Sequence, residues 1–535
     1  MTTRLETNKL VLGAYLVALL TVAGVGVWAI AIRAVEGLRV TNLTSHVPWG
    51  LWVAFYIYFI GLSAGSFLMS TLIYVFGMSR FESIGRSALF VAIVALVAGL
   101  AFIFLDLGHL ERFWTVFVNR SPTSVLEWEI HFYLLYGIIL LAELWLLMRR
   151  DLIRAAEGEG LRALVARLLS FGSHDLSEES AHLDRRAVKI LGTIGIPVAI
   201  AVHGGTGAIF AVVKARPYWY TGLFPIIFIV SALASGGALL LCITALFSRR
   251  KGTADHAELV SQLAKIVGAF LLLDLVLLTS EMLVGLYGGV PDHVATYRVI
   301  MFGPFWYVFW FGQMGLGALV PLALIFLKRT GNSPFWLGVA GACIVVGILG
   351  VRLNIVIPPL SVPLMPGIDT AYPLGRFSTF AFTGFSLHLL QGAVAVFVVA
   401  MVVLLSQLWR IPIPSWERWV VRLATTGAIF VLVIMGLRLA GFAPTTSALF
   451  DISLATAPTT PLPLFFGGQI KAQDPTFYSP SMIEWLSSTG VIAVAILALS
   501  LGRWLLPLEE PPVHPARAVR PRFDSDRIGT ERETS

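Results

Sequence analysis

Charged residues are scarce in this chain: only 13% of its 535 residues are Asp, Glu, Lys or Arg, whereas soluble domains usually carry about 25%. Hydrophobic residues make up 57% of the sequence, which excludes both an ordinary soluble enzyme and a disordered chain. The net charge of +7 is small for this length and is spread over many loops, so no basic stripe marks a nucleic-acid surface. The composition therefore predicts a membrane protein that contacts lipids and does not bind nucleic acid.

Cysteine is also scarce. Cys242 and Cys343 are the only two, and both lie in apolar runs. An iron–sulfur cluster typically needs four cysteines, and two give no disulfide framework. Histidine adds little, because only His131, His203 and His388 lie in or beside apolar runs and none repeats at helical spacing. We therefore expect no haem, iron–sulfur cluster or metal in this chain.

Long apolar runs are abundant and set the fold class. A membrane-spanning helix needs about 20 mostly apolar residues, and the sequence predicts an all-α, polytopic transmembrane helix bundle with about twelve spans. The predicted spans are Leu10–Ile32, Trp49–Phe76, Ser87–Leu105, Phe132–Met148, Val188–Val213, Leu223–Phe247, Ile266–Leu286, Phe305–Leu327, Trp336–Val351, Phe382–Leu408, Leu423–Ala440 and Trp485–Leu506.

Lysine and arginine set the expected orientation, because basic residues favour the cytoplasmic side. With the N-terminus inside and the spans alternating, the basic clusters all fall inside, and an even number of spans returns the C-terminus inside. We therefore expect a multi-pass protein of the bacterial inner membrane with both termini in the cytoplasm. The clusters are Arg149/Arg150, Arg185/Arg186, Arg249/Arg250/Lys251 and Lys328/Arg329.

Loops and composition divide the chain into segments. The charged stretch 149–187 includes Leu161–Leu169, which could form an interfacial helix. The tail is rich in Pro, Arg and Glu and is expected to be disordered. The expected segments are a four-span bundle (1–148), the cytoplasmic insert (149–187), a second bundle (188–357), a helical hairpin (382–440), a periplasmic loop (442–484), the last span (485–506) and the cytoplasmic tail (507–535).

Polar side chains gather at the predicted outer ends of several spans. Ionisable groups near a membrane are costly, so they usually face a cavity, a partner or each other. His131 and His203 could be ligands, proton carriers or ordinary hydrogen-bonding groups, and outer charges often form plain salt bridges. The outer set is Asp106, His109, Arg112, Glu129, His131, His203, Arg216, Arg352 and Asn354.

Three acidic residues lie inside predicted spans. Asp274 and Glu281 are seven residues apart, which puts them on one helix face about 10 Å apart along the axis. Glu143 lies near the inner end of its span. Carboxyl groups in apolar surroundings can exchange protons near neutral pH. The three could form a proton path, or they could be neutral acids paired with hydroxyl or backbone groups.

Several short motifs, in this order, resemble the NrfD/PsrC-type membrane subunits, and the later ones are closest to the HybB branch. The motifs are His46–Trp52 (HVPWGLW), Gly61–Ser66 (GLSAGS), Leu105–Trp114 (LDLGHLERFW), Ser121–Ser124 (SPTS) with Trp128–Glu129, His203–Gly207 (HGGTG), Ala215–Trp219 (ARPYW), Ser231–Gly236 (SALASG), Arg352–Asn354 (RLN), and Tyr478–Ser481 (YSPS) with Glu484–Trp485.

The resemblance implies a membrane anchor that reacts with quinone, either menaquinone or ubiquinone, near the outer face. It implies a ferredoxin-like iron–sulfur subunit on the periplasmic face, which exchanges electrons with a catalytic subunit such as a molybdopterin enzyme or a nickel–iron hydrogenase. The anchor itself usually carries no haem or metal. About ten spans are usual in the HybB branch, so 382–440 would be an extra hairpin.

By the same resemblance, Asp106, Glu129 and His203 are the expected reactive residues, with Asp106 or Glu129 accepting protons and His203 or His109 bonding a quinone carbonyl. His131, Arg352 and Asn354 are expected to line the quinone site beside them. Arg112 and Arg216, and alternatively Arg352, are expected to dock the partner or to pair with the acids. Proton movement through Glu143, Asp274 and Glu281 could accompany the redox reaction. The alternative function is a secondary transporter or proton-conducting protein without quinone chemistry.

Overall fold

The computed structural model describes residues 2–44, 46–75, 77–78, 81–248, 253–364 and 478–508, and in this part of the chain the structure is helical without a strand. Ten of the described helices are long and apolar enough to cross a membrane. The helices are α1 (Thr2–Glu36), η1 (Gly37–Val40), α2 (Leu51–Tyr74), α3 (Glu82–Asp106), η3 (Leu110–Phe117), α4 (Val125–Ala156), α5 (Leu161–Leu169), α6 (Glu178–Ala211), α7 (Phe224–Phe247), α8 (Ala254–Tyr287), α9 (Pro291–Phe302), η4 (Val308–Leu319), α10 (Val320–Phe326), α11 (Pro334–Ser361) and α16 (Met482–Leu505).

The prediction of an all-helical membrane bundle is confirmed, and ten of the twelve predicted spans correspond to these helices. The predicted hairpin 382–440, most of the loop 442–484, the tail beyond 508 and the basic residues 249–251 lie outside the described residues. Several helices are longer than the predicted spans. For example, α4 begins at Val125, because Ser124 caps it by accepting the backbone N–H of Glu127.

Helix α2 is the most enclosed of the described spans and forms the centre of the molecule. It packs against α3 and α7 most extensively, and also against α6 and α11. At Gly65 the backbones of α2 and α7 meet so closely that an added Cβ would overlap the carbonyl oxygen of Ala232. Small residues permit such approaches between membrane helices. The polar side chains of α2 are therefore held inside the bundle.

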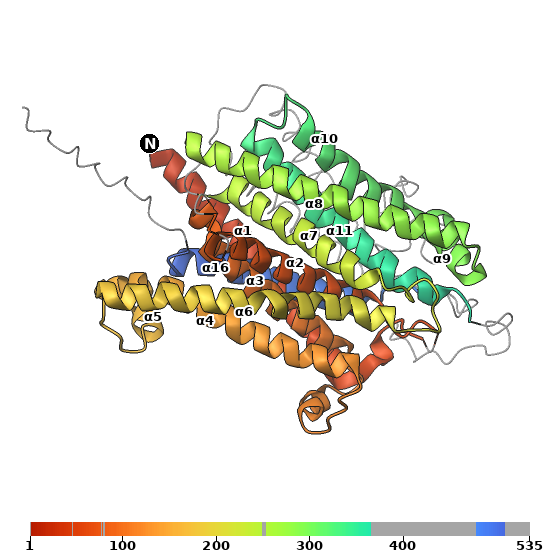
Figure 1. Ribbon diagram of the computed structural model, residues 1–535. Helices are drawn as coiled ribbons and strands as arrows, with labels where there is room; N and C mark the ends of the chain where they lie inside the picture. Colours follow the sequence, from red (N-terminus) through yellow and green to blue (C-terminus); the bar gives the residue numbers. More distant parts are fainter. Residues whose placement is uncertain are drawn as a thin grey trace, which may run out of the picture.

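The remaining spans surround α2 in two groups (Figure 1). On one side α3, α4 and α6 complete a four-helix group with α2, and on the other α7, α8, η4 and α11 pack together. Helices α1 and α16 pack against each other at Gly26 and Gly490 and against the first group through α3. We call the end of the bundle that carries η3 and α9 the η3 end, and the opposite end, with α5, the α5 end.

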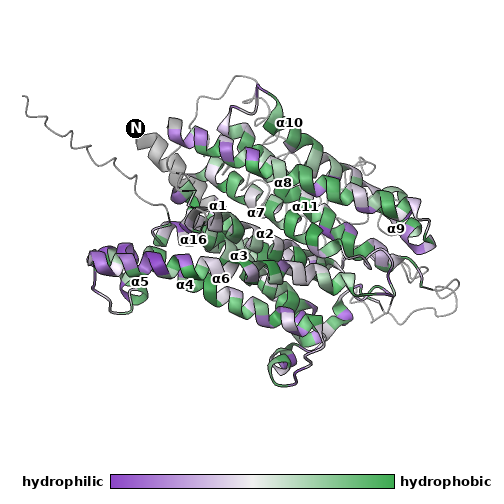
Figure 2. Ribbon diagram, in the orientation of Figure 1, coloured by the Kyte–Doolittle hydropathy of each residue, from purple (hydrophilic) through white to green (hydrophobic). Residues whose placement is uncertain are grey.

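The surface pattern fits a membrane environment. Figure 2 shows hydrophobic middle sections along the helices and hydrophilic residues at their ends, most clearly where α4 and α6 approach α5. Many large apolar side chains are exposed along the spans, including Val97, Ile138, Val276 and Phe311. With no water in the bilayer core, such side chains are expected to face lipid. The chain is therefore an integral membrane protein.

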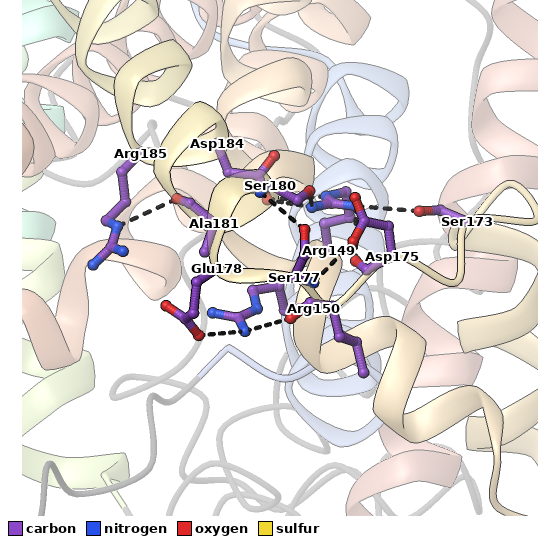
Figure 3. A network of polar contacts seen from close by, with 11 residues as sticks. Arg149, Arg150, Ser173, Asp175, Ser177, Glu178, Ser180, Ala181, Asp184 and Arg185 are labelled. Carbon is purple, nitrogen blue, oxygen red and sulfur yellow. Dashed lines mark hydrogen bonds and ion pairs between the residues drawn. The ribbon is translucent and has the colours of Figure 1, made fainter.

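Arg149 organises the α5 end. Its guanidinium pairs with Asp184 of α6 at 2.8 Å, and it donates to the Ser173 hydroxyl at 3.1 Å and to the Ser180 hydroxyl. Arg150 pairs with Glu178 at 3.1 Å beside it (Figure 3). The helix predicted at Leu161–Leu169 is present as α5. The charged segment between α4 and α6 is thus fastened to both helices.

Candidate functional site

Four polar layers follow one another along α2 and organise the candidate site. From the η3 end inward they meet α2 at Trp52, Tyr56, Gly61 and Ser63. The rise of a helix places the first and last about 17 Å apart. Each layer joins α2 to a different set of neighbouring spans.

The outermost layer is the Asp106 cluster, formed by Arg33, Asn42, Asp106, Tyr478 and Glu484. Arg33 is 1% exposed, donates to backbone carbonyl oxygens at the end of α3 and interacts electrostatically with Asp106. Glu484 accepts the backbone N–H of Asn42 at 3.2 Å and the Tyr478 hydroxyl. Burial, reinforced by the Glu484 charge, raises the pKa of Tyr478. Asp106 Oδ1 is buried without a hydrogen-bond partner among the described residues.

The second layer is the Glu129 network, formed by Tyr56, Glu129, Tyr133 and Thr206. Glu129 is 1% exposed, and its Oε1 accepts three hydroxyls: Tyr56 at 3.0 Å, Tyr133 and Thr206. Its Oε2 is buried with no hydrogen-bond partner in the described structure. Buried polar atoms are normally hydrogen-bonded, so an unpartnered one points to a water or ligand. The hydrogen bonds to Oε1 hold the carboxyl group in place, while Oε2 is available to bond a water or a ligand.

The third layer is the His203 cluster, formed by Gly61, His203, Phe228, Ser231 and Arg352. His203 is 1% exposed, and neither ring nitrogen has a hydrogen-bond partner among the described residues. The fully buried Arg352 donates to the Ser231 hydroxyl at 3.0 Å and lies over the Phe228 ring at 4.7 Å. Gly61 leaves room here, because an added Cβ would lie 3.3 Å from His203 Nε2. The cluster offers buried donors, and a neutral imidazole can also accept.

A polar stripe on α4 connects the second layer with the α5 half of the bundle. Glu129, Tyr133, Tyr136 and Glu143 share one helix face and are each at most 2% exposed. Glu143 follows Glu129 by 14 positions, which corresponds to about 21 Å along the helix axis. The fourth layer lies on this stripe at Ser63 of α2: Ser63 donates to the backbone carbonyl of Ala92 at 2.7 Å, and Tyr136 donates to the backbone carbonyl of Ser63 at 3.1 Å. Both carboxyl oxygens of Glu143 are buried without a hydrogen-bond partner among the described residues.

Asp274 and Glu281 lie on one continuous helix, α8, and both are buried, at 2% and 8% exposed. Asp274 lies within electrostatic range of Arg352, which belongs to the His203 cluster. Glu281 accepts the Thr221 hydroxyl at 3.4 Å nearer the η3 end. The two acids therefore belong to different surroundings.

Three of the predicted residues lie near the surface at the η3 end. His109 is exposed and contacts Glu111 at 3.0 Å, and Arg112 is exposed beside the same Glu111 at 3.7 Å. His131 is half-buried, and its Nδ1 lies 2.9 Å from the carbonyl oxygen of Glu127. The structure does not bring these three side chains into the buried layers. Their expected roles stay predictions.

Two further predicted residues have partners within the chain. Arg216 donates to the carbonyl oxygens of Pro359 and Val362 at 2.9 and 2.6 Å, which fastens the end of α11. Burial lowers the pKa of Arg216, and the charge of Asp292 acts in the opposite direction. Asn354 donates to Gln313 Oε1 at 2.9 Å, on the side of α11 that faces η4.

Sequence reasoning missed the tyrosines and the partners of Asp106. Tyr133, Tyr136 and Glu143 follow Glu129 at spacings of four, seven and fourteen residues, a one-face pattern that the sequence displays. Arg33 and Glu484, in contrast, are joined to Asp106 only by the packing of α1 and α16 beside α3. Among the described residues, no group of three or more His, Cys, Asp or Glu side chains is arranged to hold a metal ion.

Comparisons with known proteins assign the family. The family described as "Polysulphide reductase, NrfD" matches residues 39–363. A selenate reductase subunit of Mesobacillus selenatarsenatis is 43% identical over 410 residues, covering 76% of this chain and 94% of that protein. The Hdr-like menaquinol oxidoreductase integral membrane subunit of Archaeoglobus fulgidus is 24% identical, covering 82% of this chain and 96% of that protein. The menaquinone reductase integral membrane subunit of Nitratidesulfovibrio vulgaris is 22% identical, covering 64% and 80%.

The matched region begins just before α2 and ends just after α11, so it contains three of the four polar layers in full and part of the Asp106 cluster. The prediction from the short motifs is confirmed at the level of the family, while the HybB branch stays a prediction. On this match, the chain belongs to the NrfD family of polysulphide reductase-type membrane proteins.

Proposed function

We propose that this chain is the quinone-reactive membrane subunit of a respiratory oxidoreductase. It would exchange electrons between the membrane quinone pool and an iron–sulfur subunit bound at the η3 end, which is periplasmic under the predicted orientation. Two of the relatives carry menaquinone or menaquinol in their names. The observation that carries the proposal is the set of buried, unpartnered polar atoms of Glu129, His203 and Arg352 around α2.

These groups match what quinone chemistry requires. Reduction of a quinone to a quinol takes up two electrons and two protons, and oxidation releases them. A neutral quinone ring needs apolar surroundings and hydrogen-bond donors for its two carbonyl oxygens. Arg352 has unpartnered buried donors, and a neutral His203 can donate from either ring nitrogen. Glu129 can take or give a proton at its free Oε2.

Asp106 offers a route between this site and the surface at the η3 end. Tyr56 lies about one helical turn from Trp52 on α2, and the Arg33 guanidinium lies 5.7 Å from the centre of the Trp52 ring. Arg33 in turn interacts with Asp106. We propose that protons pass between Glu129 and the aqueous side through the Asp106 cluster.

The exposed surface at the η3 end is the proposed docking area for the iron–sulfur subunit. Helix η3 has no buried residue and exposes Phe113 and Trp114 at 55% and 53%. Aromatic residues and arginine are enriched in protein interfaces. Arg112 on the same helix is also exposed. The catalytic subunit would be bound through that partner.

Proton movement across the membrane is a further part of the proposal. The stripe from Glu129 through Tyr133 and Tyr136 to Glu143 extends toward the α5 end, and hydroxyl groups can pass protons between carboxyl groups. Asp274, near Arg352, offers a second approach from α8. Glu143→Gln should lower the number of protons released per electron if the stripe conducts, and an unchanged ratio would leave the redox role without proton coupling.

The test of the main proposal is electron exchange between a water-soluble quinol and the iron–sulfur centres of the purified complex, followed by absorbance. Asp106→Asn should slow this exchange at least about tenfold, since it removes a proton-exchanging group. Asp255→Asn is the matched control, because Asp255 is exposed on α8 near the α5 end. A complex that neither binds quinone nor reacts with quinol would refute the proposal and favour the transporter function.

A further inference from the structure

A cavity lies in the second helix group, between α7, α8, α9, η4 and α11. Its lining residues surround about 670 Å³ of space, which includes the part that is open to the surroundings. The wall is mostly apolar and includes Phe224, Ile300 and Phe309. The cavity is formed by different side chains from the Glu129 network.

Three polar side chains, those of Tyr297, Gln313 and Asn354, are among the residues that line this cavity. Gln313 and Asn354 both line it, are 8% and 5% exposed, and are joined by one hydrogen bond of 2.9 Å. That bond uses one polar atom of each amide, so the Gln313 amide nitrogen and the Asn354 oxygen have no hydrogen-bond partner among the described residues. Tyr297, 6% exposed, also lines the cavity, and its hydroxyl has no hydrogen bond within the described structure.

The backbone of η4 supports the interpretation as a binding site. Residues Val308–Leu319 form a π-helix, and Gln313 lies at its middle. π-helical turns are rare and are frequently found at functional sites. The helix is fastened to α11 on one side, because Gly317 and Gly347 meet so closely that neither tolerates a Cβ without a shift. The unusual helix and its partner therefore hold the two amides at the cavity.

Charge limits what the cavity can hold. No lysine or arginine is among the residues that line it, and its one ionisable acid is Glu281. The phosphate of a lipid headgroup would find no cation there and would be repelled by an ionised carboxylate. A neutral ring with two carbonyl oxygens could instead accept hydrogen bonds from the Gln313 amide and the Tyr297 hydroxyl. These groups fit a quinone headgroup.

The cavity also has an exit suited to a long apolar tail. Thr279 on α8 is exposed, and Met282 on α8 and Met314 on η4 are half-buried; all three line the cavity. The cavity therefore reaches the lipid-facing surface between α8 and η4. Methionine side chains are flexible and adapt to a passing ligand. An isoprenoid tail could leave the cavity at this point.

We propose that this cavity is a second quinone-binding site, in which the Gln313–Asn354 amide pair and Tyr297 hold the headgroup while the tail leaves between α8 and η4. The inference rests on the proposed quinone-reactive function, and it adds a binding site that does not need the Glu129 network. It assigns Asn354 and Glu281 to this second site.

The test is photolabelling of the purified complex with a photoactivatable azido derivative of menaquinone, followed by peptide mass spectrometry. Label is expected on the peptides that carry Met282 or Met314 as well as near Glu129. Ile300→Trp, which fills the cavity, should reduce the α8 and η4 label at least tenfold and leave the label near Glu129. Ile190→Trp is the matched control, because Ile190 is half exposed on α6, at 50%.

A second variant keeps the test decisive if Ile300→Trp does not fold. Gln313→Leu removes the amide pair and keeps a side chain of similar volume. It should reduce the label on α8 and η4, and half as much quinone should be extracted per chain as from the unchanged protein. Label confined to the Glu129 region would refute the second site while preserving the proposed function. Phospholipid bound in place of the label, and unaffected by Gln313→Leu, would show a lipid cavity and refute the second quinone site. No label anywhere and no quinol reaction would refute the proposed function itself.

Discussion

Replacing Glu129 with glutamine separates proton exchange from structure at the candidate site. The amide oxygen can still accept the three hydroxyls that Tyr56, Tyr133 and Thr206 donate to Oε1. The amide nitrogen takes the place of Oε2, and Oε2 itself has no hydrogen-bond partner among the described residues. An additional unsatisfied buried donor costs about 1–3 kcal/mol, so the variant should fold and melt a few degrees lower at most.

The effect on turnover should be much larger than the effect on stability. General acid–base catalysis typically contributes about 10²–10⁴-fold, and glutamine cannot take up or release the proton. Quinol oxidation by the purified complex should therefore fall at least about 100-fold, whereas the amount of bound quinone should change little. The assay is steady-state reduction of the complex by a water-soluble quinol, with thermal melting of the same preparation.

Two comparison variants make the result interpretable. Tyr133→Phe removes one hydroxyl donor and keeps the carboxyl group, so turnover should fall only about two- to tenfold, the equivalent of one net hydrogen bond. Glu127→Gln makes the same chemical change two residues earlier on α4, where the side chain pairs with Arg120 outside the Glu129 network, and should leave turnover within about twofold. If turnover of Glu129→Gln stays within twofold of that of the unchanged protein, the proposed role of Glu129 in proton exchange is refuted.

Three further predictions test the packing and the two ends of the bundle. Gly65→Ala should lower the melting temperature of the complex, since the new Cβ overlaps the Ala232 carbonyl oxygen and overpacking costs about 1–3 kcal/mol; Gly24→Ala, with nothing within 4 Å of the new Cβ, should not. Arg149→Met should expose the segment between α4 and α6 to proteolysis, because its ion pair and hydroxyl contacts are lost; equal cleavage rates would contradict this. Burial lowers the pKa of His293, so the folded state binds fewer protons than the unfolded state below about pH 6.5. The melting temperature should therefore fall as the pH drops through this range, and it should fall less in His293→Phe. The same pH dependence of the melting temperature in both proteins would contradict this prediction.

The fold class followed from the sequence because the bilayer imposes a simple constraint. Every backbone polar group in lipid must be satisfied within the chain, so long apolar runs can only be spanning helices. The eighth predicted span shows the limit of this reasoning. Phe305–Leu327 was correctly placed as a span, but its π-helical stretch Val308–Leu319 depends on how η4 packs against α11. Hydropathy does not distinguish a π-helix from an α-helix.

The candidate site was predicted in part, for a similar reason. Asp106, Glu129, His203 and Arg352 were expected at the outer half of the bundle, and the structure places all four at the polar layers around α2. His109 was expected beside them and lies at the surface instead. A residue just beyond a span can turn inward or outward, and the sequence does not say which.

What the sequence determined by itself was local: which segments are apolar enough to span, where acids and histidines interrupt them, and which residues share a face of one helix, as Glu129 and Glu143 do. Those properties depend only on residue type and helical period. The tertiary structure decided which helix each face meets. It joined Glu484 to Asn42, 442 residues earlier in the chain, and placed Asn354 beside Gln313 in the lining of the cavity. Such pairings arise from the shapes of packed helices, which no single segment encodes.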